Sequence, residues 1–256
     1  MLKIDNKRNR EGLFIPLKKK ALIIGITGQD GINLSKILLK KKFIVIGSTR
    51  NIRKAKSKFN KLKELNKIKL YKELFYSYNS TRKFLRNHKP KYIFFLGGQS
   101  SVGKSFQKPI ETYQSNILPI SNILEVIRKY SNQIKIYNSS SSDIFGNQGK
   151  KKLNENSNYF PISPYGLAKS ASTDLVKSYR KSFKINGYNG ICFNHESFHR
   201  NTNFLFGKLL KVINSSKSSR KIKFGKSNIT RDWGLSKEYV NAYLKIILSK
   251  QPDDYV

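Results

Sequence analysis

The sequence predicts an α/β protein built on a doubly wound parallel sheet, and two observations support this prediction. Apolar runs of strand length recur between residues 20 and 193, and segments with helical periodicity separate them. Gly25, Gly28 and Gly31 follow the first apolar run at a G-x-x-G-x-x-G spacing. A glycine turn between a strand and a helix is typical of the first βαβ unit of this fold class.

The glycine turn is flanked by the two elements that this interpretation needs. The apolar run at residues 21–24 predicts a buried strand, and the pattern after the turn predicts an amphipathic helix from about Ile32 to Lys41. Gly25 permits the tight bend, Gly28 lets the backbone approach a pyrophosphate, and Gly31 lets the helix pack on the strand. An ordinary strand-to-helix turn is the alternative, but the flanking elements favour a dinucleotide-binding (Rossmann) unit.

The rest of this domain continues the alternation of strands and helices. Further strands are predicted at residues 43–48, 69–71 (weakly), 92–96, 134–138 and 188–193. Helices are predicted at residues 80–88, 109–130 and from 164 to about 185, and residues 51–66 form a charged connection. Pro90 ends the first of these helices because the residue before a proline avoids the α region. Ser163 and Pro164 suit the N-cap and first position of the third helix, which Asn186 and Gly187 are expected to close.

Beyond residue 193 the alternation weakens. Helices are predicted at residues 204–213 and 236–248, with a short strand near 222–224. The chain of 256 residues suits one large domain and part of another. We expect a basic flexible leader without chemistry at residues 1–19, a dinucleotide-binding domain at 20–193, and the beginning of a smaller C-terminal substrate lobe at 194–256.

The charge balance is strongly basic. Lysine and arginine total 51 against 15 acidic residues, which gives a net charge of +36. This balance usually suggests nucleic acid or an anionic membrane, but the cationic residues are spread along the whole chain. We therefore expect solvated faces and no specific nucleic-acid partner, while a polyanion-binding protein is an alternative supported by charge alone. The same field would attract an anionic sugar nucleotide.

Other classes of protein are disfavoured by the pattern of apolar residues and by the cysteine count. The sequence has no apolar run of transmembrane length and no signal peptide, so we expect a cytoplasmic protein without a membrane partner. The single cysteine, Cys192, cannot form an internal disulfide and lies in an apolar run, which predicts a packed core residue. We predict no metal site.

The predicted topology gathers several polar stretches at one edge of the sheet. Ligands of such sheets lie outside the carboxyl ends of the strands. The glycine turn, Gly97–Gly98, the serines at 139–142 and Asn194–His195 all follow predicted strand ends, so we expect them to converge on one crevice. Arg50 stands just beyond the second strand, where an acid favours NAD and an arginine accommodates the extra phosphate of NADP. Arg50 therefore predicts NADP.

Tyr165 and Lys169 are the predicted reactive pair. They are four residues apart on one predicted helix, so their side chains share a face. An ammonium beside a phenol favours the phenolate and is expected to lower the pKa of Tyr165. A tyrosine tuned in this way takes a proton from a sugar hydroxyl while a hydride leaves for a nicotinamide. The serines at 139–142 add hydroxyl groups at a neighbouring strand end.

Together these stretches resemble the extended short-chain dehydrogenase/reductase family, and within it the GDP-mannose 4,6-dehydratases. The matching segments are residues 25–31, 96–100, 137–146, 163–169, 189–197 and 231–234. Asn-His-Glu-Ser at 194–197 and Arg-Asp-Trp-Gly at 231–234 are far more specific than the glycine turn. The resemblance extends from about residue 20 to the end. It implies NADP-dependent conversion of GDP-mannose to GDP-4-keto-6-deoxymannose, and an assembly of several copies of the chain.

The resemblance also implies a role for individual residues. Tyr165 would accept the hydroxyl proton, Ser141 would hydrogen-bond the C4 oxygen, and Asp143 would remove the proton from C5. The implied catalytic residues are Ser141, Asp143, Tyr165 and Lys169. The implied cofactor contacts are Gly25, Ile26, Thr27, Gly28, Gln29, Asp30, Gly31, Arg50, Leu96, Gly97, Gly98, Gln99, Ser100, Lys169, His195 and Arg200. The implied substrate contacts are Asn194, Lys208 and Arg231.

Several positions depart from the family pattern. Asp143 replaces a glutamate and reaches about 1.5 Å less far. Glu111 stands where a tyrosine is expected, His199 where an arginine is expected, and family members continue past the position of Val256. Two alternatives follow. A related epimerase or reductase would need Tyr165 and its lysine but not the acid at 143, and a nucleotide-binding remnant would be catalytically impaired.

Overall fold

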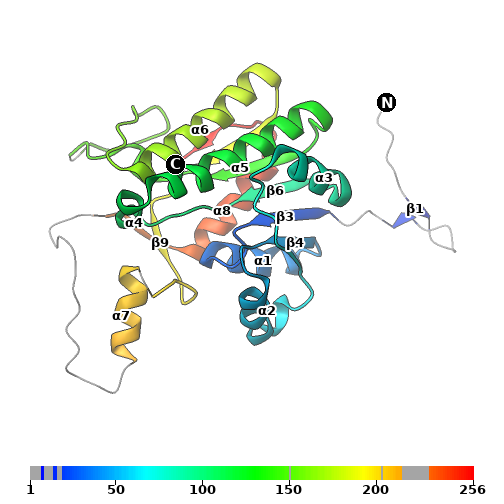
Figure 1. Ribbon diagram of the computed structural model, residues 1–256, viewed down its shortest axis with the longest axis horizontal. Helices are drawn as coiled ribbons and strands as arrows, with labels where there is room; N and C mark the ends of the chain where they lie inside the picture. Colours follow the sequence, from blue (N-terminus) through cyan, green and yellow to red (C-terminus); the bar gives the residue numbers. More distant parts are fainter. Residues whose placement is uncertain (1–6, 9–13, 16–18, 150, 203, 215–230) are drawn as a thin grey trace.

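A seven-stranded parallel sheet forms the centre of the protein, as the computed structural model shows (Figure 1). The structure describes residues 7–8, 14–15, 19–149, 151–202, 204–214 and 231–256. The strand order is β11-β8-β7-β6-β3-β4-β5, and all neighbouring strands in this sheet pair in parallel. The strands are β3 (Lys20–Ile24), β4 (Ile44–Ser48), β5 (Lys69–Tyr71), β6 (Tyr92–Phe95), β7 (Lys135–Ser139), β8 (Asn186–Gly190) and β11 (Asp254–Tyr255). The strand order reverses between β3 and β6, which is where such sheets bind ligands.

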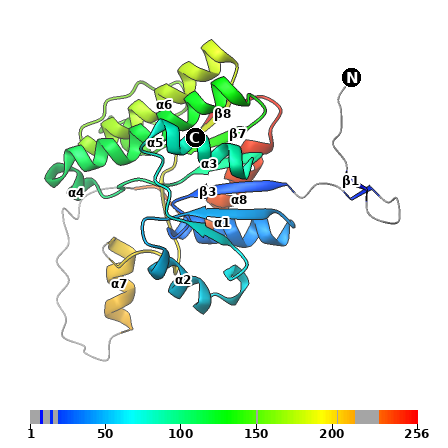
Figure 2. The same cartoon turned by 45° about the vertical axis from the view of Figure 1, so that its right-hand side comes forward.

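Helices cover both faces of this sheet (Figures 1 and 2). One face carries α1 (Gln29–Lys40), α2 (Ile52–Lys61) and α8 (Ser236–Leu248). The other carries α3 (Tyr78–His88), α5 (Pro109–Tyr130) and α6 (Pro164–Phe183). Alternate residues of one strand supply the two cores: Ala21 and Ile23 pack toward α1, whereas Leu22 and Ile24 pack toward α5. Strands buried on both faces explain the continuous apolar runs in the sequence.

The predicted doubly wound sheet is confirmed, with local corrections. Helix α1 begins at Gln29, three residues before the predicted start at Ile32. Helix α6 ends at Phe183 because Lys184 adopts the left-handed conformation (φ 55°, ψ 32°). Asn186 and Gly187 therefore begin β8 instead of closing the helix. The helix α4 (Val102–Gln107) and the edge strand β11 were not predicted.

The segment after β8 contributes both to the sheet and to a separate wall. The strand β9 (Asn194–Glu196) pairs in parallel with β10 (Trp233–Leu235), and α7 (Leu205–Ile213) projects away from the sheet in both views (Figures 1 and 2). By contrast, α8 packs on α1, and β11 extends the sheet beside β8. The boundary expected at residue 193 and the partial substrate lobe stay predictions. The expected strand near 222–224 lies outside the described residues.

Little of the leader at residues 1–19 is described. Two short strands, β1 (Lys7–Arg8) and β2 (Phe14–Ile15), pair antiparallel with each other. A short 3-10 turn at Lys63–Leu65 and another at Ser142–Ile144 complete the elements of the described chain. Within these described residues, no helix is both long enough and apolar enough to cross a membrane.

Candidate active site

The glycine turn is held by direct contact between backbones. Gly25 has φ +82°, and a Cβ there would lie 2.8 Å from Cα of Gly97, in the loop after β6. A Cβ on Gly31 would lie 2.6 Å from Cα of Ile26, so α1 starts directly against the turn. The N–H of Gly28 donates to the carbonyl of Gly25 at 3.0 Å and closes the bend. Gly28 is the N-cap of α1 and brings no side-chain cap, which leaves the N-terminal N–H groups of α1 facing the cleft beside it.

This cleft of about 920 Å³ lies at the carboxyl ends of β3, β6, β7 and β8. The structure brings most of the predicted site residues together around it. The predicted residues that line it are Gly25, Gly28, Gln29, Asp30, Gly31, Leu96, Gly97, Gly98, Ser100, Ser141, Asp143, Tyr165, Lys169, Asn194, His195, Arg200, Lys208 and Arg231. The convergence expected from strand ends is therefore present in the folded chain.

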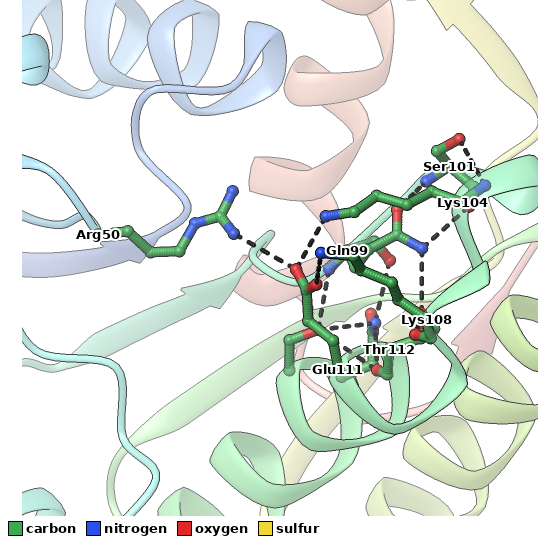
Figure 3. Close-up of polar contacts among 9 residues, drawn as sticks. Arg50, Gln99, Ser101, Lys104, Lys108, Glu111 and Thr112 are labelled. Atoms are coloured by element: carbon green, nitrogen blue, oxygen red, sulfur yellow. Dashed lines mark hydrogen bonds and ion pairs between the residues drawn. The ribbon is translucent and has the colours of Figure 1, made fainter.

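Four predicted cofactor contacts do not line the cleft. The side chain of Ile26 is fully buried in the core between the sheet and α1, so the cofactor contact predicted for Ile26 stays a prediction that concerns its backbone alone. The carbonyl of Thr27 accepts a hydrogen bond from Lys58 Nζ at 3.1 Å. Gln99 is buried, and its side-chain amide donates to the carbonyl of Ser101 and to Thr112 Oγ1 (Figure 3). Gln99 therefore supports the loop through its buried side chain. The fourth residue, Arg50, follows β4 and has an exposed side chain that lies 4.0 Å from Glu111 Oε1.

The loop after β7 meets the start of α6 and assembles the predicted catalytic residues. Ser141 Oγ donates to Asp143 Oδ2 at 3.1 Å and accepts the N–H of Asp143 at 3.3 Å. Ser163 caps α6 by accepting the N–H of Gly166 at 3.0 Å, which places Tyr165 in the first turn. Gly166 packs so closely that a Cβ there would lie 2.6 Å from the carbonyl oxygen of Asp143. Tyr165 and Ser141 therefore line the same part of the cleft, and the Ser141 hydroxyl favours the charged form of the phenol.

The electrostatics of this group correct one expectation. Burial raises the pKa of Tyr165 above its ordinary value, and the Ser141 hydroxyl offsets only part of that rise. Lys169 does not lower the pKa of the phenol as predicted, because its Nζ donates to the carbonyl of Ser139 at 2.8 Å and lies 5.9 Å from the centre of the tyrosine ring. Burial also lowers the pKa of Lys169 to about 8. The spacing of four residues places Tyr165 and Lys169 on one face of α6, but burial determines the direction in which the pKa of each side chain shifts.

A hydrogen-bonded group of Gln29, Asp30, His195 and Ser236, which we call the polar latch, joins the glycine turn to the segment after β8. Asp30 accepts from Ser236 Oγ at 2.7 Å, and its other oxygen lies 2.8 Å from His195 Nε2. Gln29 Nε2 donates to the carbonyl of His195 at 2.7 Å. Burial disfavours the charged imidazole, but the hydrogen bond and charge of Asp30 outweigh it and raise the pKa of His195. The predicted cofactor residues Gln29, Asp30 and His195 therefore also hold each other.

The far wall of the cleft comes from β9, α7 and the start of β10. Asn194 lies in β9, Lys208 in α7 and Arg231 just before β10, and all three line the cleft. Arg200 Nε lies 3.1 Å from Glu196 Oε2, and its guanidinium stacks 3.8 Å from the centre of the Phe204 ring.

Sequence reasoning did not assign several residues of the site. Glu196 and Trp233 line the cleft and belong to the two specific motifs, which was the signal that could have marked them. Ser236 and Tyr239, which stacks 4.2 Å from the His195 ring, had no such signal. Cys192 is a buried core residue, as predicted, with its thiol 3.3 Å from Tyr243 Oη. Among the described residues, no three or more His, Cys, Asp or Glu side chains gather in a way that could hold a metal ion.

Comparisons with known proteins agree with this arrangement. The model of a family described as GDP-mannose 4,6 dehydratase matches residues 22–256. The chain is 34% identical to a GDP-mannose 4,6-dehydratase from Vibrio cholerae, covering 94% of this chain and 67% of that protein. It is 33% identical to GDP-mannose 4,6 dehydratase 1 from Arabidopsis thaliana, covering 97% and 72%. The chain thus spans about two thirds of the length of these relatives.

Solved structures show the same fold at lower identity. A dTDP-glucose 4,6-dehydratase from Streptomyces venezuelae with NAD and TYD bound superposes with a TM-score of 0.80 at 14% identity, covering 92% of this chain and 74% of that one. A UDP-N-acetylglucosamine 4-epimerase from Methanobrevibacter ruminantium gives 0.79 at 22% identity, covering 93% and 75%. At these identities the likeness shows the fold alone.

Proposed function

This chain belongs to the GDP-mannose 4,6 dehydratase family, and we propose that it catalyses the NADP-dependent dehydration of GDP-mannose to GDP-4-keto-6-deoxymannose. The observation that carries the proposal is the convergence of Ser141, Asp143 and Tyr165 on one cleft, where the Ser141 hydroxyl donates to the Asp143 carboxylate and Lys169 lies one turn beyond Tyr165 on α6. A phenol, a hydroxyl and a carboxylate around one cleft suit the removal of two protons from one sugar.

The cleft residues fit a nicotinamide dinucleotide. The close backbone contacts of Gly25 and Gly31 and the N-terminus of α1 leave N–H groups for a pyrophosphate. Arg50 follows β4, a position at which an arginine suits the extra phosphate on the adenosine ribose, and this is the basis for proposing NADP. When bound, this cofactor would supply the acceptor for the hydride on C4, once reduced the donor of a hydride to C6, and in its oxidised form a positive charge that favours the phenolate of Tyr165.

In the proposed reaction, side chains of this chain accept and donate the protons. Tyr165 takes the proton of the C4 hydroxyl, while Ser141 holds the C4 oxygen. The resulting ketone acidifies the hydrogen on C5, and Asp143 takes that proton. The hydroxyl on C6 then leaves with this proton as water, and the proton held by Tyr165 returns to C5. The net change is the loss of one water molecule from the sugar.

The nucleotide end of the substrate is assigned to the far wall. Asn194 lines the cleft from β9, Lys208 from α7, and Arg231 from two residues before β10. Two cationic side chains and an amide suit a nucleoside diphosphate sugar, because both phosphates between the nucleoside and the sugar are negatively charged. An assembly of several copies stays a prediction, which light scattering on the purified protein would check.

The proposal is tested by incubating the purified protein with GDP-mannose and NADP and identifying the product by mass spectrometry and NMR. A product lighter than the substrate by one water supports the dehydratase. A C4 epimer or a reduced sugar would instead favour the related epimerase or reductase, and bound cofactor without turnover would favour the impaired remnant. Tyr165→Phe is expected to abolish turnover while cofactor binding persists, and retained turnover would refute Tyr165 as the base.

A further inference from the structure

Three cationic side chains surround one carboxylate beside α4, the helix whose first residue, Val102, lines the cleft (Figure 3). Glu111 Oε1 lies 2.8 Å from Lys104 Nζ and 4.0 Å from Arg50 Nη1. Its other oxygen lies 3.8 Å from Lys108 Nζ. We call these four residues the rim cluster. Its three cations share a single internal counter-ion.

The rim cluster joins elements from both sides of the place between β3 and β6 where the strand order of the sheet reverses. Arg50 follows β4, Lys104 lies in α4, and Lys108 and Glu111 lie at the start of α5. Thr112, the neighbour of Glu111, is hydrogen-bonded to the buried Gln99 of the loop after β6 (Figure 3). The backbone of Glu111 is thereby fixed relative to the cleft, so its charge is presented at a defined place next to Arg50.

Arg50 and Glu111 are the two residue types, an arginine and an acid, that distinguish NADP-binding from NAD-binding sites in this fold. In this fold an acid near the end of the second strand suits the ribose hydroxyls of NAD, and an arginine suits the additional phosphate of NADP. A phosphate that approaches Arg50 also approaches the carboxylate of Glu111, which repels it. The hydrogen bond from Lys104 lowers the pKa of Glu111, with the charges of Lys104, Lys108 and Arg50 acting in the same direction, so this carboxylate is ionised at neutral pH.

We propose that Glu111 is a specificity-determining residue that weakens the preference for NADP over NAD, because it serves as the internal counter-ion of Arg50, Lys104 and Lys108. Removing its charge frees these cations for the extra phosphate, whereas NAD has no group there that gains from them. The inference rests on the proposed function, since it concerns the cofactor that the cleft would hold.

The test compares the dissociation constants of NADPH and NADH, measured by nicotinamide fluorescence on the full-length protein. We expect Glu111→Gln to tighten NADPH binding by about fivefold to tenfold at low ionic strength, with NADH changed less than about twofold, as for partly exposed charges. The gain is expected to shrink at 0.5 M salt, which screens exposed charges. Glu111→Asp keeps the charge and is expected to keep the ratio of the wild type.

Glu125→Gln is the matched control. Glu125 lies on the same helix and pairs with Arg128 at 2.6 Å and Lys129 at 3.1 Å, but it sits 14 residues further along α5, about 21 Å away. Glu125→Gln removes one negative charge, as Glu111→Gln does, so the two variants have the same net charge. An NADPH gain in Glu125→Gln equal to that in Glu111→Gln would overturn the inference, and so would an unchanged ratio in Glu111→Gln. Failure of the wild type to bind either nucleotide would overturn the proposed function itself.

Discussion

The two sides of the cleft are held by different kinds of contact. On one side, Gly25 and Gly31 place backbone against backbone, with no room for a Cβ. On the other, the segment around His195 is attached through the side-chain contact of His195 with Asp30, which also accepts a hydrogen bond from Ser236 Oγ. A backbone contact cannot adjust to an added atom, whereas a hydrogen bond can be weakened in steps. Substitutions on the glycine side are therefore expected to disrupt the folding of the site, whereas substitutions in the polar latch are expected to change its stability by smaller amounts.

The largest effect is expected at the glycine turn. Gly31→Ala places a Cβ 2.6 Å from backbone atoms of Ile26, which cannot swing away. We expect a loss of about 3 kcal/mol in the free energy of unfolding, or a fall of about 6–12 °C in the melting temperature. Thermal unfolding followed by circular dichroism measures this.

Gly103→Ala provides the control for that variant. Nothing lies within 4 Å of a Cβ on Gly103, which sits in the helix α4. Its melting temperature is expected to stay level or to rise slightly, because alanine favours helix. Equal melting temperatures for the two variants would contradict the claim that backbone contact holds the turn.

The next effect is a change in the turnover rate on substitution of Asp143, in the loop after β7. Asp143→Glu restores about 1.5 Å of reach to a carboxylate whose position depends on its hydrogen bond with Ser141. If short reach limits the proposed reaction, turnover is expected to rise, by up to about a hundredfold, because a misplacement near 1 Å can cost that much. Steady-state kinetics with GDP-mannose measure kcat. An unchanged or lower kcat would show that the aspartate is already well placed.

A smaller effect is expected from the polar latch. Asp30→Asn removes the charge that accepts from Ser236 Oγ and faces His195. We expect a loss of about 1–3 kcal/mol in a urea titration, as for hydrogen bonds to a partly buried charge. Glu64→Gln removes a carboxylate of the exposed pair with Lys36 and is expected to cost less than about 1 kcal/mol. Equal losses would mean that the latch is no stronger than a surface ion pair.

The smallest effect is a dependence of stability on pH. Because the pKa of His195 is raised in the folded chain, its contribution is fully present below the pKa of the unfolded state and is lost as pH rises through the folded value. The stability difference between wild type and His195→Gln is therefore expected to be larger at pH 6 than at pH 8. His88 and His199, whose pKa values are lowered, act in the opposite sense and cancel in this comparison. A difference that grows with pH would contradict the assignment.

Much of the fold and of the candidate site could be predicted from the sequence. Apolar runs mark strands because both faces of a parallel sheet are buried, and the carboxyl ends of parallel strands meet at one edge. The glycine turn, the serine loop and Tyr165 can therefore be placed around one crevice from the sequence alone. The edge strand at Asp254–Tyr255 could not, since two residues are too short to show a period.

The sequence by itself thus determined the alternation of strands and helices over residues 20–193 and the edge of the sheet where the polar residues collect, because periodicity and strand ends are local properties of the chain. Only the tertiary structure decided which charges meet there. Burial raises the pKa of Tyr165 against the expected influence of Lys169, and Arg50 faces Glu111 from an element more than fifty residues away in sequence. Such pairings depend on distances between distant segments and on the water that burial removes, and neither quantity is encoded in a local pattern.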